Sequence, residues 1–188
     1  MSTKTLIGVL LAGITGVLIF LFVHLSGGSG GGPIKLGSSK AEACTKGARD
    51  CLPEVNYVDT QGKAYTPKSL TGQVVIVNFW GTFCPPCKKE IPDLSAAYDK
   101  YKDKGLVILG VMSDDPSDSE LLNFASDFQM TYPVVRSSSD IQVAFSYPDK
   151  LPTTFVFSRG GKQVYSKVGA LRADEIKQII EPLLAEKP

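Results

Sequence analysis

The sequence predicts an α/β domain that follows one membrane-spanning helix. Residues 6–25 contain no Asp, Glu, Lys or Arg, and a helix of 20 residues is about 30 Å long, which matches the hydrocarbon thickness of a bilayer. Further along, apolar runs rich in β-branched residues alternate with segments of helical periodicity, a pattern typical of an α/β fold. The third observation is the motif Cys84-Pro85-Pro86-Cys87, which stands between a predicted strand and a predicted helix.

A cleavable signal peptide is the alternative to an anchor at residues 6–25. The apolar region of a signal peptide usually spans about 7–15 residues and ends at a small-residue cleavage site. Here the apolar stretch is longer, and only a weak candidate site follows it at 26–28. The Gly- and Ser-rich segment after it is a flexible linker by composition. The expected organisation is a tail, an anchor, a linker and a folded domain, at residues 1–5, 6–25, 26–52 and 53–188.

The first elements of the folded domain follow from apolar patterning and turn residues. A β-hairpin is expected at 54–66, with its turn at Gln61-Gly62. The apolar run at 73–80 predicts a buried central strand. The helix that follows the cysteines should end at Gly105, and 106–112 is a second buried strand.

The second half of the domain continues the alternation. Ser117 and Glu120 form a capping-box pattern that predicts a helix to about residue 128. A short extended segment, a short helix, a hairpin and a C-terminal helix are then expected at 132–136, 140–145, 153–168 and 176–184. Pro182 should kink or weaken the last turn of the C-terminal helix.

The spacing of Cys84 and Cys87 points to thiol–disulfide exchange. If the helix begins at Pro85, Cys84 is its N-cap residue, where unpaired N–H groups and the helix dipole favour a thiolate. Cys87 lies one turn inside the helix and is shielded. We therefore expect Cys84 to attack the substrate disulfide and Cys87 to resolve the mixed disulfide. Pro85 and Pro86 stiffen the first turn, where a missing N–H costs little.

A zinc site and a pair of buried structural cysteines are the alternatives for this motif. Zinc needs four ligands, but His24 is the single histidine and lies in the predicted anchor. Cys44 and Cys51 are separated by six residues, which is wider than usual for such a site. We therefore expect no metal and no cofactor other than the cysteine pair itself. The net charge of +1 gives no indication of nucleic-acid binding.

Two segments resemble motifs of the TlpA/ResA-like branch of the thioredoxin superfamily. Residues 77–92 read VNFWGTFCPPCKKEIP and resemble the active-site stretch, and residues 151–155 read LPTTF and resemble the second motif. The match covers roughly 53–184. It implies a thioredoxin fold, in which helices flank a central mixed sheet, here with an N-terminal β-hairpin extension and the one transmembrane helix. It also implies thiol–disulfide oxidoreductase activity.

The resemblance further implies a location and partners. The chain would be a single-pass protein of the bacterial cytoplasmic membrane, with the catalytic domain facing the periplasm or cell exterior. Its substrates would be disulfides of extracytoplasmic proteins, including the C-x-x-C-H segments of apocytochrome c. Its electrons would come from a membrane thiol-electron transporter of the CcdA/DsbD type.

The same resemblance assigns residues to the substrate site. Pro152 would be a cis-proline that faces the cysteines, whereas without the cysteine motif it would be an ordinary strand-entry proline. Phe83 stands where the family usually has tryptophan, and Trp80 could equally be packing beneath the loop. The residues expected to contact substrate are Trp80, Phe83, Pro85, Pro86, Leu151, Pro152 and Thr153.

The proton acceptor is a separate question, because Asn78 stands where thioredoxin has a buried aspartate. The resemblance points to Asp114 or Asp115, after the second strand, as the acidic residue near the cysteines. A partly desolvated carboxylate there could take the proton of Cys87. The alternative is a solvated Asp-Asp-Pro turn before a helix.

Cys44 and Cys51 have no counterpart in the family's motifs. In a straight helix they would be about 10.5 Å apart along the axis, whereas a disulfide needs a Cα separation of about 4.4–6.8 Å. Gly47 would permit the turn that brings them together. A structural disulfide is favoured over an accessory redox pair or free thiols.

The direction of electron transfer is open from the sequence, because it depends on the reduction potential. A reductase is the main hypothesis, and an oxidase or isomerase of the same fold is the alternative. A metal-binding or copper-delivery module is disfavoured by the absence of histidine from residues 26–188, and a peroxidase by the absence of a Pro-x-x-x-Thr-x-x-Cys segment.

Overall fold

The computed structural model describes residue 44 and residues 50–186. The predicted tail, anchor and most of the linker lie outside the described residues. Within the described part, no helix combines the length and apolarity needed to cross a bilayer.

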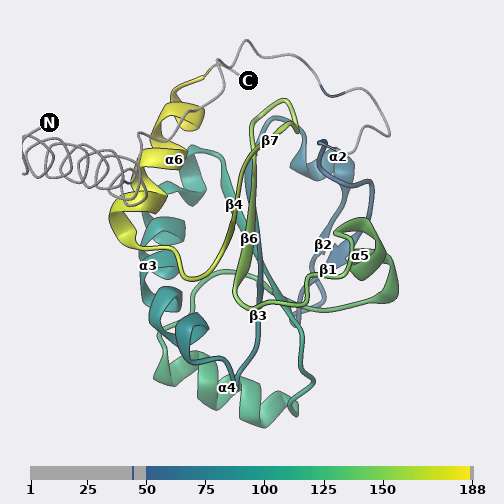
Figure 1. Ribbon diagram of the computed structural model, residues 1–188, viewed down its shortest axis with the longest axis vertical. Helices are drawn as coiled ribbons and strands as arrows, with labels where there is room; N and C mark the ends of the chain where they lie inside the picture. The colour runs from purple at the N-terminus through teal and green to yellow at the C-terminus, as the bar shows by residue number, and fades with distance from the viewer. Residues whose placement is uncertain (1–43, 45–49, 187–188) are drawn as a thin grey trace, which may run out of the picture. The chain divides into compact units, whose positions relative to one another are not determined.

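A five-stranded mixed sheet forms the centre of the domain (Figure 1). The order of its strands is β5-β4-β3-β6-β7. The central strand β3 runs parallel to β4 and antiparallel to β6. The strands are β3 (Val74–Trp80), β4 (Leu106–Met112), β5 (Val134–Arg136), β6 (Thr153–Phe157) and β7 (Gln163–Val168).

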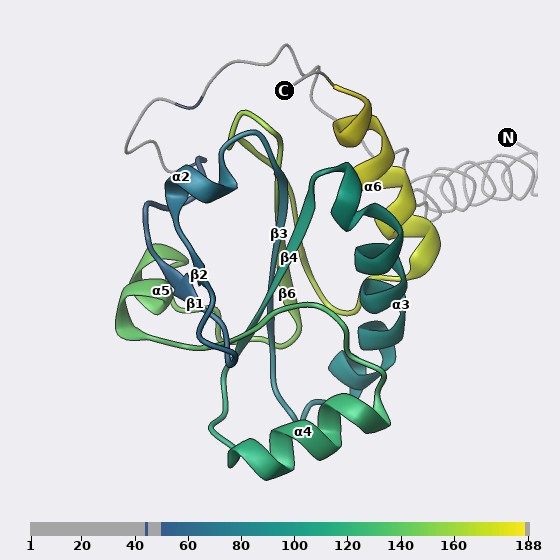
Figure 2. The ribbon, with the colours of Figure 1, turned by 180° about the vertical axis from the view of Figure 1, so that it is seen from behind.

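Helices cover both faces of this sheet (Figures 1 and 2). One face carries α3 (Pro85–Tyr101) and α6 (Ala173–Ala185). The other carries α5 (Ser139–Ala144) and a two-stranded hairpin, while α4 lies across one end of the sheet. The remaining bounds are β1 (Tyr57–Val58), β2 (Ala64–Tyr65), α2 (Pro67–Leu70) and α4 (Asp118–Asp127).

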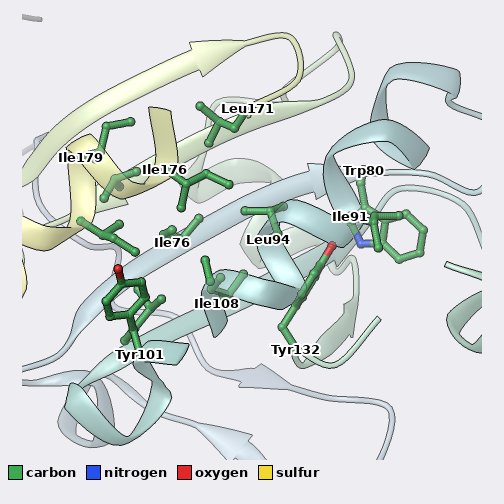
Figure 3. Packing of buried hydrophobic residues seen from close by; sticks show 14 of the residues in the cluster. Ile76, Trp80, Ile91, Leu94, Tyr101, Ile108, Tyr132, Leu171, Ile176 and Ile179 are labelled. Carbon is green, nitrogen blue, oxygen red and sulfur yellow. The ribbon is translucent and has the colours of Figure 1, made fainter. Parts of the chain in front are cut away.

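Two hydrophobic clusters hold these layers together, because successive side chains of a strand point to opposite faces. From β3, Ile76 packs against α3 and α6, in contact with residues such as Leu94 and Ile176 (Figure 3). Val77 and Phe79 pack in the other cluster. All seven residues of β3 are buried, which explains why the sequence shows a continuous apolar run there instead of alternation.

The structure confirms the predicted architecture, a mixed sheet flanked by helices and preceded by a β-hairpin. It adds α2, which the sequence analysis did not predict although Thr66 caps it and Pro67 opens it. The helix after the cysteines changes to a 3-10 turn at Lys102–Lys104 before it stops at Gly105, whose φ of 94° is left-handed. The C-terminal helix continues through Pro182 to Ala185.

Candidate active site

Cys84 and Cys87 lie at the N-terminus of α3, directly after the central strand. Cys84 is the N-cap residue, and its sulfur accepts a hydrogen bond from the backbone N–H of Cys87 at 3.2 Å. The two cysteines form a disulfide with a Cα–Cα distance of 5.3 Å. Pro85 and Pro86 occupy the first turn, where the sequence predicted them. In this oxidised form Cys84 is 4% exposed and Cys87 is fully buried.

The second motif is brought to the same end of the sheet by strand pairing. The Leu151–Pro152 peptide bond is cis, and Thr153, the next residue, pairs with Phe79 near the end of β3. The cis conformation predicted for Pro152 is therefore confirmed, and a contact between Pro152 and substrate stays a prediction.

The other predicted substrate residues differ in exposure. Phe83 is 67% exposed, Pro85 is exposed, and Leu151 is half-buried. Trp80 is fully buried and stacks on Phe124 with ring centroids 5.3 Å apart. This placement agrees with the packing alternative for Trp80, because the ring packs in the hydrophobic cluster that also contains Cys84 and Cys87.

Glu90 is a candidate functional residue that the sequence analysis missed. It follows Cys87 by three residues in α3, so both side chains lie on one face of the helix. Glu90 has no exposed surface, and burial raises the pKa of its carboxyl group from 4.5 to about 7. A group with this pKa can take up or release a proton at neutral pH. The sequence feature that could have identified Glu90 is its place directly beside an apolar helix position, Ile91, which is buried.

Hydrogen bonds from three separate elements hold the Glu90 carboxyl group. Asn78 of β3 donates from Nδ2 to Glu90 Oε1 at 2.8 Å, and Leu171 donates its backbone N–H to Oε2 at 2.8 Å. Asn78 also donates to the hydroxyl of Thr154 at 3.0 Å. These bonds lower the pKa of Glu90 and oppose part of the desolvation. At the position where thioredoxin has a buried acid, Asn78 thus binds a buried acid that comes from α3.

Asp114 and Asp115 point to different surroundings. Asp114 accepts hydrogen bonds from the backbone N–H and the hydroxyl of Thr82, in the loop that precedes Cys84. Asp115 is 88% exposed and forms an ion pair with Arg136. Asp114 therefore touches the active-site loop, and Asp115 contacts the end of β5.

Cys44 and Cys51 are joined by a disulfide with a Cα–Cα distance of 5.7 Å, as the sequence analysis favoured. The backbone N–H of Cys44 donates to Gly160 O at 3.2 Å, and that of Leu52 donates to Gly161 O at 2.7 Å. This disulfide therefore lies against the turn between β6 and β7. Among the described residues, no group of three or more His, Cys, Asp or Glu side chains is arranged to hold a metal ion.

A Cys-Pro-Pro-Cys disulfide at a helix N-terminus, with a cis-proline at the same end of a mixed sheet, defines an oxidoreductase of the thioredoxin-like class. Residues 48–166 match the model of the AhpC/TSA family. A relative named thiol-disulfide oxidoreductase ResA, from Bacillus thuringiensis (strain Al Hakam), is 30% identical over 131 residues, which are 70% of this chain and 75% of the relative. A ResA from Geobacillus thermodenitrificans (strain NG80-2) is 33% identical over 132 residues, with the same two coverages.

A solved structure supports the same class. The crystal structure of a thiol:disulfide interchange protein of the thioredoxin family, from Chlorobium tepidum TLS, matches with a TM-score of 0.67 and 25% identity, over 75% of this chain and 100% of that chain. The chain belongs to the AhpC/TSA family and, within it, to the thiol-disulfide oxidoreductases of the ResA type. The predicted thioredoxin-like fold of the domain and the predicted reaction class are thereby confirmed.

Proposed function

We propose that the chain is a membrane-tethered reductase that transfers electrons from the Cys84–Cys87 dithiol to disulfides of extracytoplasmic proteins, including the C-x-x-C-H segments of apocytochrome c. The observation that carries the proposed direction is the buried Glu90 carboxyl group one turn from Cys87. A neighbouring carboxylate disfavours a thiolate. The carboxylate thus offsets part of the stabilisation that the N-terminus of α3 gives the reduced pair, so the pair gives up its electrons more readily.

The exchange proceeds in two steps that balance. The Cys84 thiolate attacks one sulfur of the substrate disulfide, a Cys84–substrate bond forms, and the second substrate sulfur leaves as a thiolate. Cys87 then loses its proton and attacks the sulfur of Cys84, which releases the first substrate sulfur. The substrate gains two electrons and becomes a dithiol, while the enzyme becomes the disulfide seen in the structure.

In this scheme Glu90 accepts the proton of Cys87. Its pKa of about 7 allows it to be deprotonated before the second step and protonated after it at neutral pH. The two residues share one face of the same helix, so Glu90 stays one turn from Cys87 in both steps. Asp114 or Asp115 would be the acceptor under the expectation from sequence, but the contacts of both go to Thr82 or Arg136.

The location and the electron donor complete the proposal. The apolar stretch at residues 6–25 supports a single-pass anchor in the bacterial cytoplasmic membrane, with the catalytic domain outside the cytoplasm. A membrane thiol-electron transporter of the CcdA/DsbD type would reduce the Cys84–Cys87 disulfide again. Protease treatment of intact spheroplasts should remove the domain from the cell and leave only a short membrane fragment.

The reaction is tested with the reduced full chain in detergent and an oxidised Cys-Ala-Ala-Cys-His peptide. We expect the peptide dithiol to appear together with an equal amount of Cys84–Cys87 disulfide. Cys84→Ser should abolish the reaction, and Cys87→Ser should accumulate a Cys84–peptide mixed disulfide, visible as a mass increase equal to one peptide.

The reverse experiment separates the two directions. The oxidised chain mixed with the reduced peptide should transfer little, because a reducing pair favours its own disulfide. Nearly complete oxidation of the peptide would replace the reductase by the oxidase alternative. No exchange in either direction would contradict the reaction itself.

A further inference from the structure

Two polar groups of Thr82 donate hydrogen bonds to one carboxylate, that of Asp114. Its backbone N–H lies 3.2 and 3.1 Å from the two carboxylate oxygens of Asp114, and its hydroxyl donates to Oδ2 of the same group. Asp114 is partly buried and belongs to the segment that follows β4. Hydrogen bonds to an ionised acceptor are about twice as strong as those between neutral groups.

Thr82 belongs to the short loop that leads directly into Cys84. Only Gly81, Thr82 and Phe83 separate the end of β3 from the N-cap of α3. Within the loop, the N–H of Cys84 donates to Gly81 O at 3.1 Å. A Cβ atom on Gly81 would lie 2.8 Å from the ring of Phe83, so a side chain there would require this exposed ring to move. A displacement of Thr82 would therefore be passed on to Cys84.

The segment that carries Asp114 is itself fixed on both sides. The N–H of Ser113 donates to Trp80 O at 2.8 Å. Arg136 of β5 pairs with Asp115 and donates to Pro116 O at 3.0 Å. Asp114 thus links the active-site loop to the rigid ends of β4 and β5.

We propose that Asp114 is a positioning residue, whose carboxylate holds Thr82 so that the sulfur of Cys84 stays aligned with the N-terminal N–H groups of α3. The proposal rests on the exchange reaction of Cys84 and gives Asp114 a role other than proton transfer. The aligned N–H groups stabilise the attacking thiolate. A loosened loop would leave the thiolate less stabilised and therefore less abundant at neutral pH.

Three roles of Asp114 give different results when its charge is removed. If Asp114 acted on Cys84 only through its negative charge, Asp114→Asn would favour the thiolate and lower the pH at which Cys84 becomes reactive. If it were only the proton acceptor of Cys87, alkylation of Cys84 would not change. If Asp114 is a positioning residue, Asp114→Asn should raise that pH. Thr82→Val should do the same, because Val lacks the hydroxyl.

The experiment measures alkylation of Cys84 by iodoacetamide from pH 5 to 10 in the reduced full chain, with Cys84 resolved by peptide mass spectrometry. We expect Asp114→Asn and Thr82→Val each to slow alkylation at pH 7 by roughly tenfold, which is the loss of thiolate that a rise of about one unit in the thiol pKa produces below that pKa. Both should raise the pH of half-maximal rate. The double variant should be slowed by less than the product of the two single effects, because both changes weaken the same contact between Thr82 and Asp114.

Matched variants separate positioning from loss of charge or of fold. Thr82→Ser keeps the hydroxyl and should react like the wild type. Asp103→Asn makes the same charge change at an exposed site beyond the far end of α3 and should have no effect. If Asp114→Asn does not fold, the proposal is tested by comparing the alkylation of Thr82→Val with that of Thr82→Ser.

Three results would overturn the proposal: a lowered pH of half-maximal rate in Asp114→Asn, a Thr82→Val variant that reacts like the wild type, or strictly additive effects in the double variant. Each of these can arise while the wild-type chain still reduces the peptide disulfide. Failure of this inference is therefore distinguishable from failure of the proposed function.

Discussion

Glu90 carries a carboxyl group into the interior of the domain at a cost in free energy. It is fully buried, and its hydrogen bonds to Asn78 and Leu171 offset only part of its desolvation. Burial of this carboxyl group therefore lowers the stability of the fold, but it makes Glu90 a suitable proton acceptor. Desolvation by burial raises its pKa to near neutrality, and the two hydrogen bonds and the charge of Lys167 lower it only in part.

The burial of Glu90 makes stability depend on pH. Because the pKa is about 7 in the folded chain and 4.5 ordinarily, the folded chain retains a proton between these values that the unfolded chain has released. The free energy of unfolding should therefore fall as the pH rises from 4.5 through 7, by about 3 kcal/mol from this group. Glu90→Gln should remove this slope, measured as urea unfolding of the oxidised full chain at pH 4.5 and 8.

The matched control is Glu54→Gln, the same change at an exposed site. It should keep the pH dependence of the wild type. In the Glu90→Gln variant, the amide oxygen can still accept from Leu171 N–H, and a turned Asn78 amide would offer its Oδ1, which is buried and has no hydrogen-bond partner in the structure, to the new NH2 group, so the variant should fold. An identical slope in Glu90→Gln and wild type would mean that Glu90 is already ionised in the folded chain.

At the scale of elements, α4 shows how far local sequence determines structure. Ser117 caps the helix, and Glu120 accepts a hydrogen bond from the N–H of Ser117 at 2.9 Å, the capping box that the sequence predicted. The body of the helix is less obvious from the sequence, because Leu121 and Leu122 are adjacent. The structure buries Leu121 against the core and leaves Leu122 71% exposed.

This contrast predicts unequal effects of one substitution on one helix. Leu121→Ala should lower the free energy of unfolding by about 2–4 kcal/mol, because it removes buried apolar surface and leaves a cavity. Leu122→Ala should change it by less than about 0.5 kcal/mol. Urea unfolding of both variants at one pH measures the difference. Equal losses would mean that α4 does not pack as the structure shows.

The parts of the site that the sequence predicted are those encoded locally. Cys84, Pro85 and Cys87 lie within one short motif, so their place at a helix start follows from strand and helix patterns. Glu90 could not be placed in this way, because a charged residue in a helix usually faces solvent. Its hydrogen-bond partner Leu171 lies 81 residues away, and only the complete fold brings them together.

The contact between Thr82 and Asp114 is likewise formed only in the complete fold. The two residues are 32 positions apart in the sequence. The resemblance pointed to Asp114 or Asp115 as the acidic residue near the cysteines, but it could not tell which of the two would contact the active-site loop or which group it would bind.

At the scale of the whole domain, the two disulfides lie at opposite ends of one hairpin. Pro152 and the active site are at the start of β6, and Cys44 contacts the turn after its end. Five strand residues separate these ends by about 17 Å. Arg159 in that turn donates to Gly72 O, Lys104 O and Leu184 O, so several elements are joined there.

This separation predicts that Cys44–Cys51 is a structural disulfide. The double variant Cys44→Ser/Cys51→Ser should lose about 2–3 kcal/mol of unfolding free energy, the value expected for a disulfide that closes such a short loop. Its rate of peptide disulfide reduction should equal that of the wild type, because the pair is too distant to exchange with Cys84. A variant of normal stability that reduces the peptide more slowly would instead identify an accessory redox pair.

The central claim is that Cys84–Cys87 is a reducing pair, and its reduction potential tests that claim most directly. The full chain is equilibrated in buffers of known dithiothreitol potential at pH 7, the thiols are trapped by alkylation, and the Cys84 peptide is quantified by mass spectrometry. The account predicts a midpoint below about −200 mV, towards the value of about −270 mV of thioredoxin. A midpoint at or above about −200 mV, towards the value of about −120 mV of a strong oxidant, would contradict it.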